Sequence, residues 1–356
     1  MKWYNPQSEP FKLYGFPFYK QDKVYRRMPL APSKPLPEAV DGLANETAGG
    51  QIRFHAKFKE LTLQVSLSSK PGYFDHIRAP HTAETTKHSF DLYLSKDGKD
   101  FVFIDVSKNL HGTEHFYERS LISFDEEQDL DVLIVFPSYG GVDKVLIGLN
   151  DEAEISAPWH KFDDDRKIVV YGGSIQQGAS ASRNGMGMSA LLSKWFNLEA
   201  YNLGFNSSGK SEPEVAEVIA EIENPAVLLI STEGNCPSSE WLEEKLAAFI
   251  DIYRQKHPET PIVVLPFIVG GKDTFVPGLM ERRMRDRDIQ RKIVDDRKNA
   301  GDKNIYIYCL DEDIPKEVNG HSIWHEVTVD GLHYNELGFY WITEGLYKFL
   351  KETVNI

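Results

Sequence analysis

The chain has 356 residues, of which 41% are hydrophobic and 26% charged, as is usual for a soluble globular protein. This length is comfortable for two domains, each with its own core. The net charge of −14 argues against nucleic acid or an anionic membrane as the main partner, because both attract basic surfaces. Apolar runs such as residues 226–230 are too short to span a bilayer, so no membrane insertion is expected.

The N-terminal 30 residues contain no hydrophobic signal region. Two cysteines, Cys236 and Cys309, do not make a disulfide framework. We therefore expect a cytoplasmic protein, or a secreted or periplasmic one if a signal peptide has been removed. The sequence does not indicate an oligomeric state.

Residues 1–155 have the alternating pattern of β-strands, with a Lys-Asp-Gly turn at 96–98. The first 45 residues, rich in proline and aromatic side chains, are expected to form an extended wrap with little regular structure. Short strands at this spacing predict a β-sandwich domain of jelly-roll type. The expected strands are 51–58, 61–67, 90–94, 101–106, 132–136 and 144–149.

Beyond a polar connection, residues 165–356 alternate between apolar strands and amphipathic helices. This alternation predicts an α/β/α domain with a parallel sheet, whose ligands bind beyond the carboxyl ends of the strands. The expected strands are 167–172, 199–203, 226–231, 261–266 and 304–309, and the expected helices are 185–197, 212–223, 239–256, 284–299 and 335–353.

Ser174 ends a Gly-Gly-Ser turn that directly follows the strand at 167–172. The glycines allow a sharp turn, which would expose the hydroxyl group at the edge of the sheet. A serine hydroxyl is a poor nucleophile unless a base removes its proton. Taken alone, this segment is equally compatible with a serine that caps the following helix.

Asp330 precedes His333 by three residues, just before the last expected helix. At this spacing a carboxylate can fix the tautomer of an imidazole that acts as a general base. The pair alone could equally be a surface hydrogen bond, but the order Ser174, Asp330, His333 indicates a serine hydrolase. No cluster of His, Cys, Asp or Glu has the spacing of metal ligands, so neither a catalytic metal nor a cofactor is expected.

An acyl-transfer serine also needs an oxyanion hole of N–H donors. Two loops after expected strands could supply it, at 202–209 and 232–237. The Asn235 side-chain amide in the second loop could donate directly, although an Asx turn before the helix at 239 would explain this residue too.

The stretch Gly204–Ser211 also fits the P-loop pattern G-x-x-x-x-G-K-[ST] and lies between a strand and a helix. Nucleotide binding additionally needs an acid at the end of another strand to hold Mg²⁺, and only Asp311 is a passable candidate. Pro213 is also awkward for a helix that should begin inside the loop. We regard nucleotide binding as the less favoured alternative.

Taken together, these blocks resemble the SGNH/GDSL hydrolase superfamily in residues 167–354. The blocks are Gly172–Ile175, Asn202–Gly209, Gly234-Asn235 and Asp330–His333, in family order. The resemblance implies a flavodoxin-like hydrolase in which Ser174 is the nucleophile, His333 the base and Asp330 its orienting acid. It also implies an oxyanion hole from the N–H groups of Ser174 and Ser207 and the Asn235 amide.

The stretch 171–186 and the second block resemble a branch in which a β-sandwich with a Gly-x-Asp-Leu-Tyr motif precedes the hydrolase. Ser89-Phe-Asp-Leu-Tyr93 is similar to that motif. Two positions depart from the family: Gly173 replaces the aspartate of Gly-Asp-Ser-Leu, and Ser207 replaces the glycine that usually gives the oxyanion N–H. If position 207 needs a positive φ, the serine adds strain of about 1 kcal/mol, and Gly209 is the alternative donor.

The resemblance implies hydrolysis of carboxylic esters. We expect a short acyl group, such as an O-acetyl group on a carbohydrate, because no apolar stretch suggests a lipase lid. The alternative is a protein of the same fold that binds acylated sugars with little turnover. The β-sandwich could bind sugar, shape the cleft or simply pack against the hydrolase. Candidate pocket residues are Gly173, Arg183, Gly209, Trp324 and His325, together with Tyr334.

Overall fold

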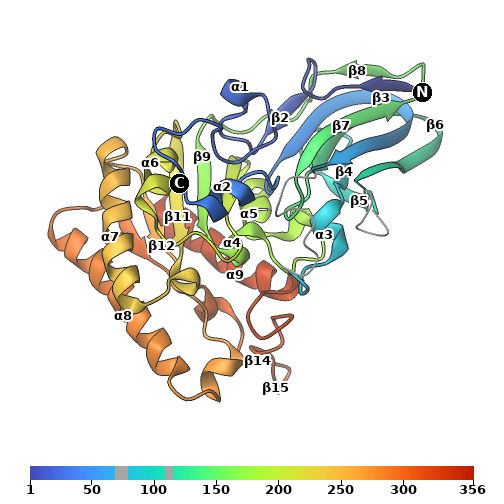
Figure 1. Cartoon of the computed structure of the whole chain (residues 1–356). Helices are drawn as coiled ribbons and strands as arrows, with labels where there is room; N and C mark the ends of the chain where they lie inside the picture. Colours follow the sequence, from blue (N-terminus) through green and yellow to red (C-terminus); the bar gives the residue numbers. More distant parts are fainter. Residues whose placement is uncertain (69–78, 109–114) are drawn as a thin grey trace. The chain divides into compact units, whose positions relative to one another are not determined.

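The computed structural model describes residues 1–68, 79–108 and 115–356, which form two compact units (Figure 1). The first unit consists of residues 1–30, 42–164 and 182–185, and the second of residues 31–41, 165–181 and 186–356. The predicted ranges were 1–155 and 165–356. Relative to them, residues 31–41 belong to the second unit instead of the first, and residues 182–185 belong to the first unit instead of the second.

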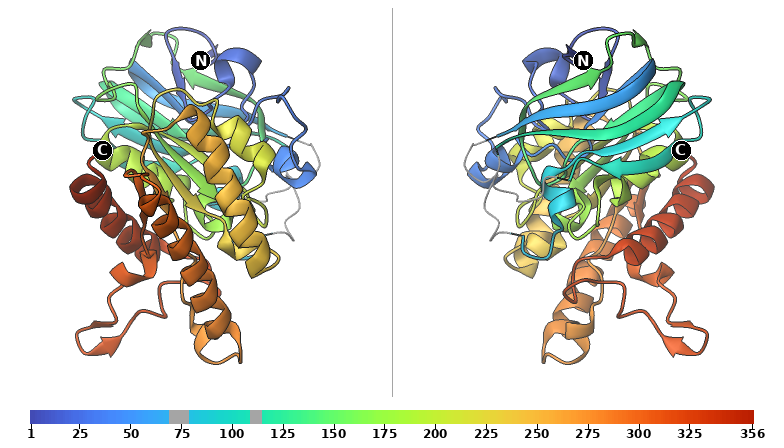
Figure 2. Two further views of the ribbon diagram at one scale, coloured as in Figure 1. Left: turned by 90° about the vertical axis from the view of Figure 1, so that its left-hand side faces the viewer. Right: turned by 90° about the vertical axis from the view of Figure 1, so that its right-hand side faces the viewer.

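The first unit is built on an antiparallel sheet, as predicted for an all-β domain. Its described strands follow the order β1-β7-β3-β6-β4-β5, and β2 and β8 also pair with β3. The right-hand view of Figure 2 shows the twisted strands of this sheet. They are β1 (Lys2–Tyr4), β2 (Lys12–Tyr14), β3 (Gln51–Leu67), β4 (Asp91–Ser95), β5 (Val102–Val106), β6 (Phe116–Val135), β7 (Val142–Leu149) and β8 (Glu154–Ser156).

Strand β3 joins two strands that the sequence pattern separated, and β6 extends far beyond the predicted 132–136. The pairing of β3 with β6 shifts register between Phe58 and Glu60 and again between Leu61 and Thr62. Such bulges insert an extra residue, so the alternation breaks although the strand continues. Side chains from the whole length of β3, including Phe58 and Leu61, lie in one apolar core.

The N-terminal segment has more regular structure than predicted. Strand β1 pairs with β7 and β2 with β3, so both extend the sheet. Short helices also occur where no helical pattern was found, because a single turn carries too few residues for a periodic signal. These are α1 (Tyr19–Asp22), α2 (Glu38–Leu43) and α3 (Glu84–His88).

The Asp-Leu-Tyr motif on β4 binds the segment 182–185 within the first unit. Asp91 is fully buried and accepts hydrogen bonds from the backbone N–H groups of Gly185 (2.8 Å) and Asn184 (3.3 Å). The Arg183 guanidinium donates to the Tyr93 hydroxyl and lies 3.6 Å from the Asp91 carboxylate. Burial raises the pKa of Asp91 to about 6, although the hydrogen bonds and the Arg183 charge act in the opposite direction.

The second unit contains the predicted parallel sheet, in the order β10-β9-β11-β12-β13. This is the flavodoxin-like order 2-1-3-4-5, so the predicted fold class is confirmed. The strands are β9 (Lys167–Gly172), β10 (Glu199–Gly204), β11 (Pro225–Ser231), β12 (Ile262–Val264) and β13 (Ile305–Ile307). A small hairpin of β14 (Glu317–Val318) and β15 (His321–Ser322) follows.

Helices cover both faces of this sheet, which explains why its strands are almost entirely apolar. Helices α5 and α9 pack on one face, and α6, α7 and α8 lie on the other (Figure 1). The helix bounds are α4 (Ser174–Gln177), α5 (Met188–Phe196), α6 (Pro213–Ile219), α7 (Ser239–Lys256), α8 (Leu279–Asn299) and α9 (Glu336–Phe349). The order of strands reverses around β9, which places the loop after β9 at the switch point where ligands bind in such sheets.

Candidate active site

Ser174 is the first residue of α4, directly after the turn that ends β9. The two glycines before it are required by the close approach of neighbouring loops. A Cβ added at Gly173 would overlap the side-chain amide of Asn235, and one added at Gly172 would overlap the carbonyl oxygen of Ser231. The strand, the turn and the helix thus place Ser174 at the carboxyl edge of the sheet.

Ser174 and His333 lie within hydrogen-bond distance, although 159 residues separate them. Ser174 Oγ is 2.9 Å from His333 Nε2. On the other side of the ring, His333 Nδ1 is 2.8 Å from Asp330 Oδ2. An ionised carboxylate only accepts hydrogen bonds, so Nδ1 carries the proton and Nε2 is left to accept from the serine. The three predicted side chains therefore form one continuous hydrogen-bonded chain.

The Asp330 carboxylate is held ionised by its own loop. Its Oδ1 accepts the backbone N–H groups of His333 (2.8 Å) and Leu332 (3.0 Å). Burial alone would raise the pKa of Asp330, but the hydrogen bonds from His333, its charge and the Leu332 N–H outweigh burial and lower the pKa to about 2. The carboxylate can thus orient the imidazole and stabilise an imidazolium at any physiological pH.

The loop after β10 packs against the end of β9. A Cβ added at Gly209 would overlap the carbonyl oxygen of Gly172. Gly209 has a φ of 77°, and Ser207 has a φ of 55°. Ser207 therefore occupies the left-handed region, and the strain anticipated for a serine at this position is present. The assignment of the oxyanion donor to Ser207 or to Gly209 stays a prediction.

Asn235 lies in the 3₁₀ turn Glu233–Asn235 that follows β11. Its Nδ2 donates a hydrogen bond to the carbonyl oxygen of Ser208. A primary amide carries two hydrogens, so a second one remains for another acceptor. Because the same amide lies against Gly173, the residue before Ser174, the loops after β9, β10 and β11 converge at Ser174.

The P-loop-like stretch does not have the form of a phosphate cradle. The N–H of Asn206 donates to Gln177 Oε1 (2.8 Å), and that of Lys210 donates to Glu212 Oε2 (2.7 Å). The N–H of Ser211 donates to the Tyr171 hydroxyl group. Helix α6 begins only at Pro213, after the loop. Three of the N–H groups that a P-loop would direct at phosphate are therefore used inside the protein, beside the buried carboxylate of Glu212.

Arg183, a predicted pocket residue, packs within the first unit. Its guanidinium lies 3.9 Å from the ring centroid of Phe103 and also contacts Tyr93. Tyr334 is fully buried in the core of the second unit, which contradicts its expected place in a pocket. An aromatic residue after the histidine was mistaken for a pocket residue because sequence alone does not show which way it points.

Trp324 and His325 lie before the Asp330 loop. Trp324 lines a hollow of about 680 Å³, together with Val269, Thr274 and residues 311–316. His325 is half exposed, and its Nδ1 lies 3.2 Å from Glu326. Of the predicted pocket residues, Trp324 is the one that lines this hollow.

Asn202, the first residue of the second block, lies near the end of β10 and has a bridging role that the sequence analysis did not assign. Its Nδ2 donates to the carbonyl oxygen of Gln176 (2.9 Å) and to Ser189 Oγ (2.9 Å), while its Oδ1 accepts the N–H of Gly204. It thereby ties the loop after β10 to the helix that begins at Ser174. A buried polar residue at the end of an apolar strand was the available signal.

The parallel five-stranded sheet, with Ser174, Asp330 and His333 beyond its strand ends, agrees with the fold of SGNH hydrolases. The model of the GDSL-like lipase/acylhydrolase family matches residues 165–351, and the chain belongs to that family. A second model, for the N-terminal domain of SGNH-type esterases with a GxDLY motif, matches residues 1–155. The protein is therefore an enzyme of the esterase class.

Three solved structures illustrate the similarity. A protein of Bacteroides ovatus assigned as a GDSL-like lipase is 27% identical, with a TM-score of 0.86 over 99% of this chain and 97% of its own. An acetyl xylan esterase of the rumen bacterium Butyrivibrio proteoclasticus is 12% identical, with a TM-score of 0.59 over 99% of both chains. A family two carbohydrate esterase of Clostridium thermocellum, in complex with cellohexaose, is 13% identical, with a TM-score of 0.59 over 86% of this chain and 93% of its own. No curated protein matches the sequence significantly.

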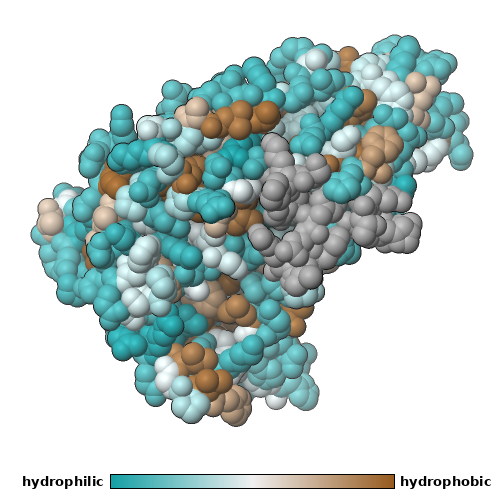
Figure 3. Space-filling view, in the orientation of Figure 1, coloured by the Kyte–Doolittle hydropathy of each residue, from teal (hydrophilic) through white to brown (hydrophobic). Residues whose placement is uncertain are grey.

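The part of the chain that the structure describes includes no helix long and apolar enough to cross a membrane. On the face drawn in Figure 3, hydrophilic residues predominate and hydrophobic ones form small separate groups.

Both cysteines, Cys236 and Cys309, are buried and free.

Proposed function

We propose that this esterase cleaves short-chain carboxylic esters, including O-acetyl groups on carbohydrates, with Ser174 as its nucleophile. The observation that carries the proposal is the hydrogen-bonded chain from Ser174 through His333 to Asp330, with heavy-atom distances of 2.9 and 2.8 Å. Nucleophile, base and orienting acid are recognised by this geometry.

In the first step, His333 Nε2 takes the hydroxyl proton of Ser174 as Oγ attacks the ester carbonyl carbon. The positive imidazolium is stabilised by the Asp330 carboxylate. The negative oxygen of the tetrahedral intermediate is bound by the N–H of Ser174, the Asn235 amide and an N–H of the loop after β10. The intermediate collapses when His333 gives its proton to the departing alcohol, which leaves an acyl group on Oγ.

In the second step, water replaces the alcohol. His333 removes a proton from the water molecule, which attacks the acyl carbonyl, and the second intermediate breaks down to a carboxylic acid and free Ser174. The same donors bind the oxyanion in both steps, and removal of one such donor typically lowers the rate about 10²–10³-fold.

The substrate class rests on two observations. The fold is shared, along most of this chain, with an acetyl xylan esterase and with a family two carbohydrate esterase in complex with cellohexaose. A hollow of the second unit is also lined by Trp324 and the carboxylate residue Glu312, whose side chains suit the apolar face and the hydroxyl groups of a sugar. Both support a carbohydrate ester as the substrate.

The test compares wild type, Ser174→Ala and the exposed-serine control Ser322→Ala on p-nitrophenyl acetate, butyrate and octanoate. We expect activity that falls with chain length in wild type and control and is absent in Ser174→Ala. Acetate release from acetylated xylo-oligosaccharides then tests the carbohydrate. Full activity of folded Ser174→Ala would disprove the mechanism, and a folded but inactive wild type would favour binding of acylated sugars without turnover.

A further inference from the structure

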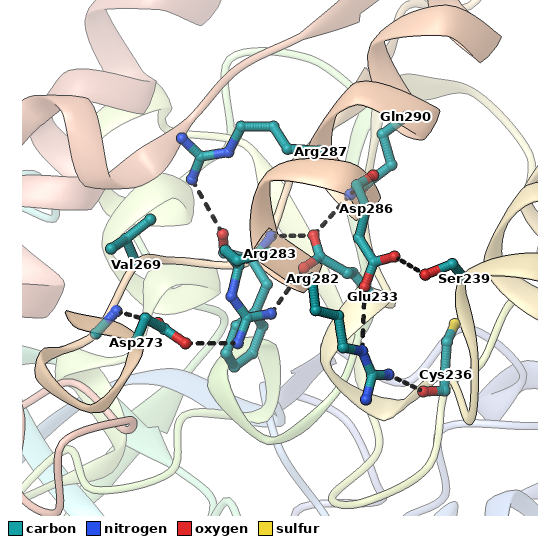
Figure 4. A network of polar contacts seen from close by, with 12 residues as sticks. Glu233, Cys236, Ser239, Val269, Asp273, Arg282, Arg283, Asp286, Arg287 and Gln290 are labelled. Carbon is teal, nitrogen blue, oxygen red and sulfur yellow. Dashed lines mark hydrogen bonds and ion pairs between the residues drawn. The ribbon is translucent and has the colours of Figure 1, made fainter. Parts of the chain in front are cut away.

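Helix α8 has a polar face that is buried in the second unit. Asp286 and Gln290 are almost completely buried, and Arg287 nearly so. Charged residues are rarely buried unless they are paired. Figure 4 shows that Asp286 points at Ser239, the first residue of α7, and that Gln290 points at Glu233 in the turn after β11.

Glu233, in the turn that carries Asn235, is bound by two side chains of α8. Its side chain is 1% exposed and accepts hydrogen bonds from Arg283 (2.7 Å) and Gln290 (2.7 Å) of α8 (Figure 4). It also accepts the backbone N–H of Phe267 (2.9 Å). A carboxylate two residues before Asn235 thus joins this loop both to α8 and to the loop after β12.

The loop is also held at Cys236, and helix α7, which follows it, is held at its first residue, Ser239. The carbonyl oxygen of Cys236 accepts a hydrogen bond from Arg282 (3.3 Å), and the Ser239 hydroxyl donates to Asp286 (Figure 4). The Phe267 ring lies so close to the backbone that a Cβ at Gly234 would overlap it. Asn235 is therefore flanked on both sides by residues whose positions α8 determines.

Arg283 extends this support to the loop of the acid and the histidine. One end of its guanidinium binds Glu233, and the other lies 3.7 Å from Asp273 (Figure 4). Asp273 accepts the N–H of Gly270 (2.7 Å). The backbone of Gly270 packs against that of Gly331, because a Cβ added at Gly270 would lie 2.7 Å from the Gly331 carbonyl oxygen. Gly331 directly follows Asp330.

We propose that Glu233 and Arg283 are positioning residues that align the Asn235 amide with the Asp330–His333 pair through one buried ion pair. This inference rests on the function proposed above. A planar guanidinium carries several N–H donors in a fixed fork, so it can bind two carboxylates in a set geometry, whereas the single ammonium nitrogen of a lysine fixes that geometry less well. Alignment of this kind is valuable because a displacement of about 1 Å at a reacting centre can cost about 10²-fold in rate.

The test is a double-mutant cycle between Arg283→Lys and Asn235→Ala, measured as kcat per folded active site, with Arg291→Lys as the control. Arg291 lies on the same helix but pairs only with exposed Asp288 among the described contacts. We expect Arg283→Lys to lower kcat about 10–100-fold with KM changed less than about 3-fold. Asn235→Ala should lower kcat about 10²–10³-fold. The double variant should be slower than Asn235→Ala by at most about a third of the factor that Arg283→Lys costs alone, because Arg283 acts partly through that amide.

Losses that multiply in the double variant would overturn the inference, as would an Arg283→Lys enzyme with wild-type kcat. If Arg283→Lys does not fold, Glu233→Gln replaces it in the same cycle with the same expectations, since it keeps the shape of the side chain and removes the ion pair. The control Arg291→Lys should keep wild-type activity. Turnover that survives Ser174→Ala would instead refute the proposed function, so the two failures are distinguishable.

Discussion

Replacing Gly209 by alanine should damage both the stability and the activity of the second unit. Gly209 has a φ of 77°, a region in which an L-residue costs about 1–2 kcal/mol. The added Cβ would also overlap the carbonyl oxygen of Gly172 and lie 2.9 Å from its carbonyl carbon. Forcing a methyl group into packed surroundings typically costs about 1–3 kcal/mol. Together these effects predict a loss of roughly 2–5 kcal/mol in the free energy of unfolding.

The matched control is Ser207→Gly in the same loop. A glycine relieves about 1 kcal/mol of strain at the φ of 55°, but it also gives the unfolded chain more freedom, which costs about 0.4–1 kcal/mol. The net change should stay within about 1 kcal/mol of zero. Because the N–H at position 207 is retained, kcat should change less than about 3-fold, whichever residue of the loop supplies the oxyanion donor.

Urea unfolding followed by circular dichroism measures both variants, and p-nitrophenyl acetate hydrolysis measures their kcat. In Gly209→Ala, relief of the overlap moves the Gly172 carbonyl, two residues before Ser174, so kcat should fall at least 10-fold. If the free energy of unfolding of Gly209→Ala lies within about 0.5 kcal/mol of the wild-type value, the loop can move to accommodate the methyl group at little cost. The steric reasoning on the approach of β9 and this loop would then be refuted.

Three further outcomes are expected. Asp330→Asn should lower kcat about 10⁴-fold without unfolding the protein, because an amide no longer enforces the productive tautomer of His333; unchanged kcat would exclude Asp330 from its assigned role. The pKa of Asp330 is about 2, so the stability that its carboxylate contributes is present above pH 4 and is lost as the pH falls through about 2. If wild type loses activity near pH 5, the protonation of another group must therefore be the cause. The pKa of Asp91 is raised from 3.8 to about 6. Its contribution to the free energy of unfolding is therefore fully present below pH 4 and is lost as the pH rises through 6, which lowers that free energy by roughly 3 kcal/mol. Urea unfolding between pH 4 and 7 should show this decline in wild type, and an equal decline in Asp91→Asn would contradict it.

The α/β rhythm of the second half could be predicted well because its strands are buried on both faces. Such strands are continuous apolar runs, and the predicted helix 239–256 coincides with α7 at both ends. Helix α8 begins at Leu279, five residues before the predicted 284, because charged residues follow its first two positions and the first half of its buried face is polar. An apolar pattern cannot reveal a face of that kind.

Within the site, sequence order and local motifs predicted which residues meet, since Ser174, Asp330 and His333 each lie in a short recognisable block. The supporting residues have no such signal. Glu233 and Arg283 are 50 residues apart, and each is an ordinary charged residue in its own segment. Their importance depends on burial and on partners, which only the folded chain establishes.

The assignment of residues 182–185 to the first unit affects how the protein can be divided. Between its ends the chain passes from one unit to the other five times, and one passage occurs eight residues after Ser174. A fragment that starts at residue 165 would keep Arg183 and Asn184 but lose Asp91 and Tyr93, their partners on β4. We therefore expect that, in genetic fusion, truncation or domain exchange, β4 and the segment 182–185 have to be transferred together if these contacts are to be kept.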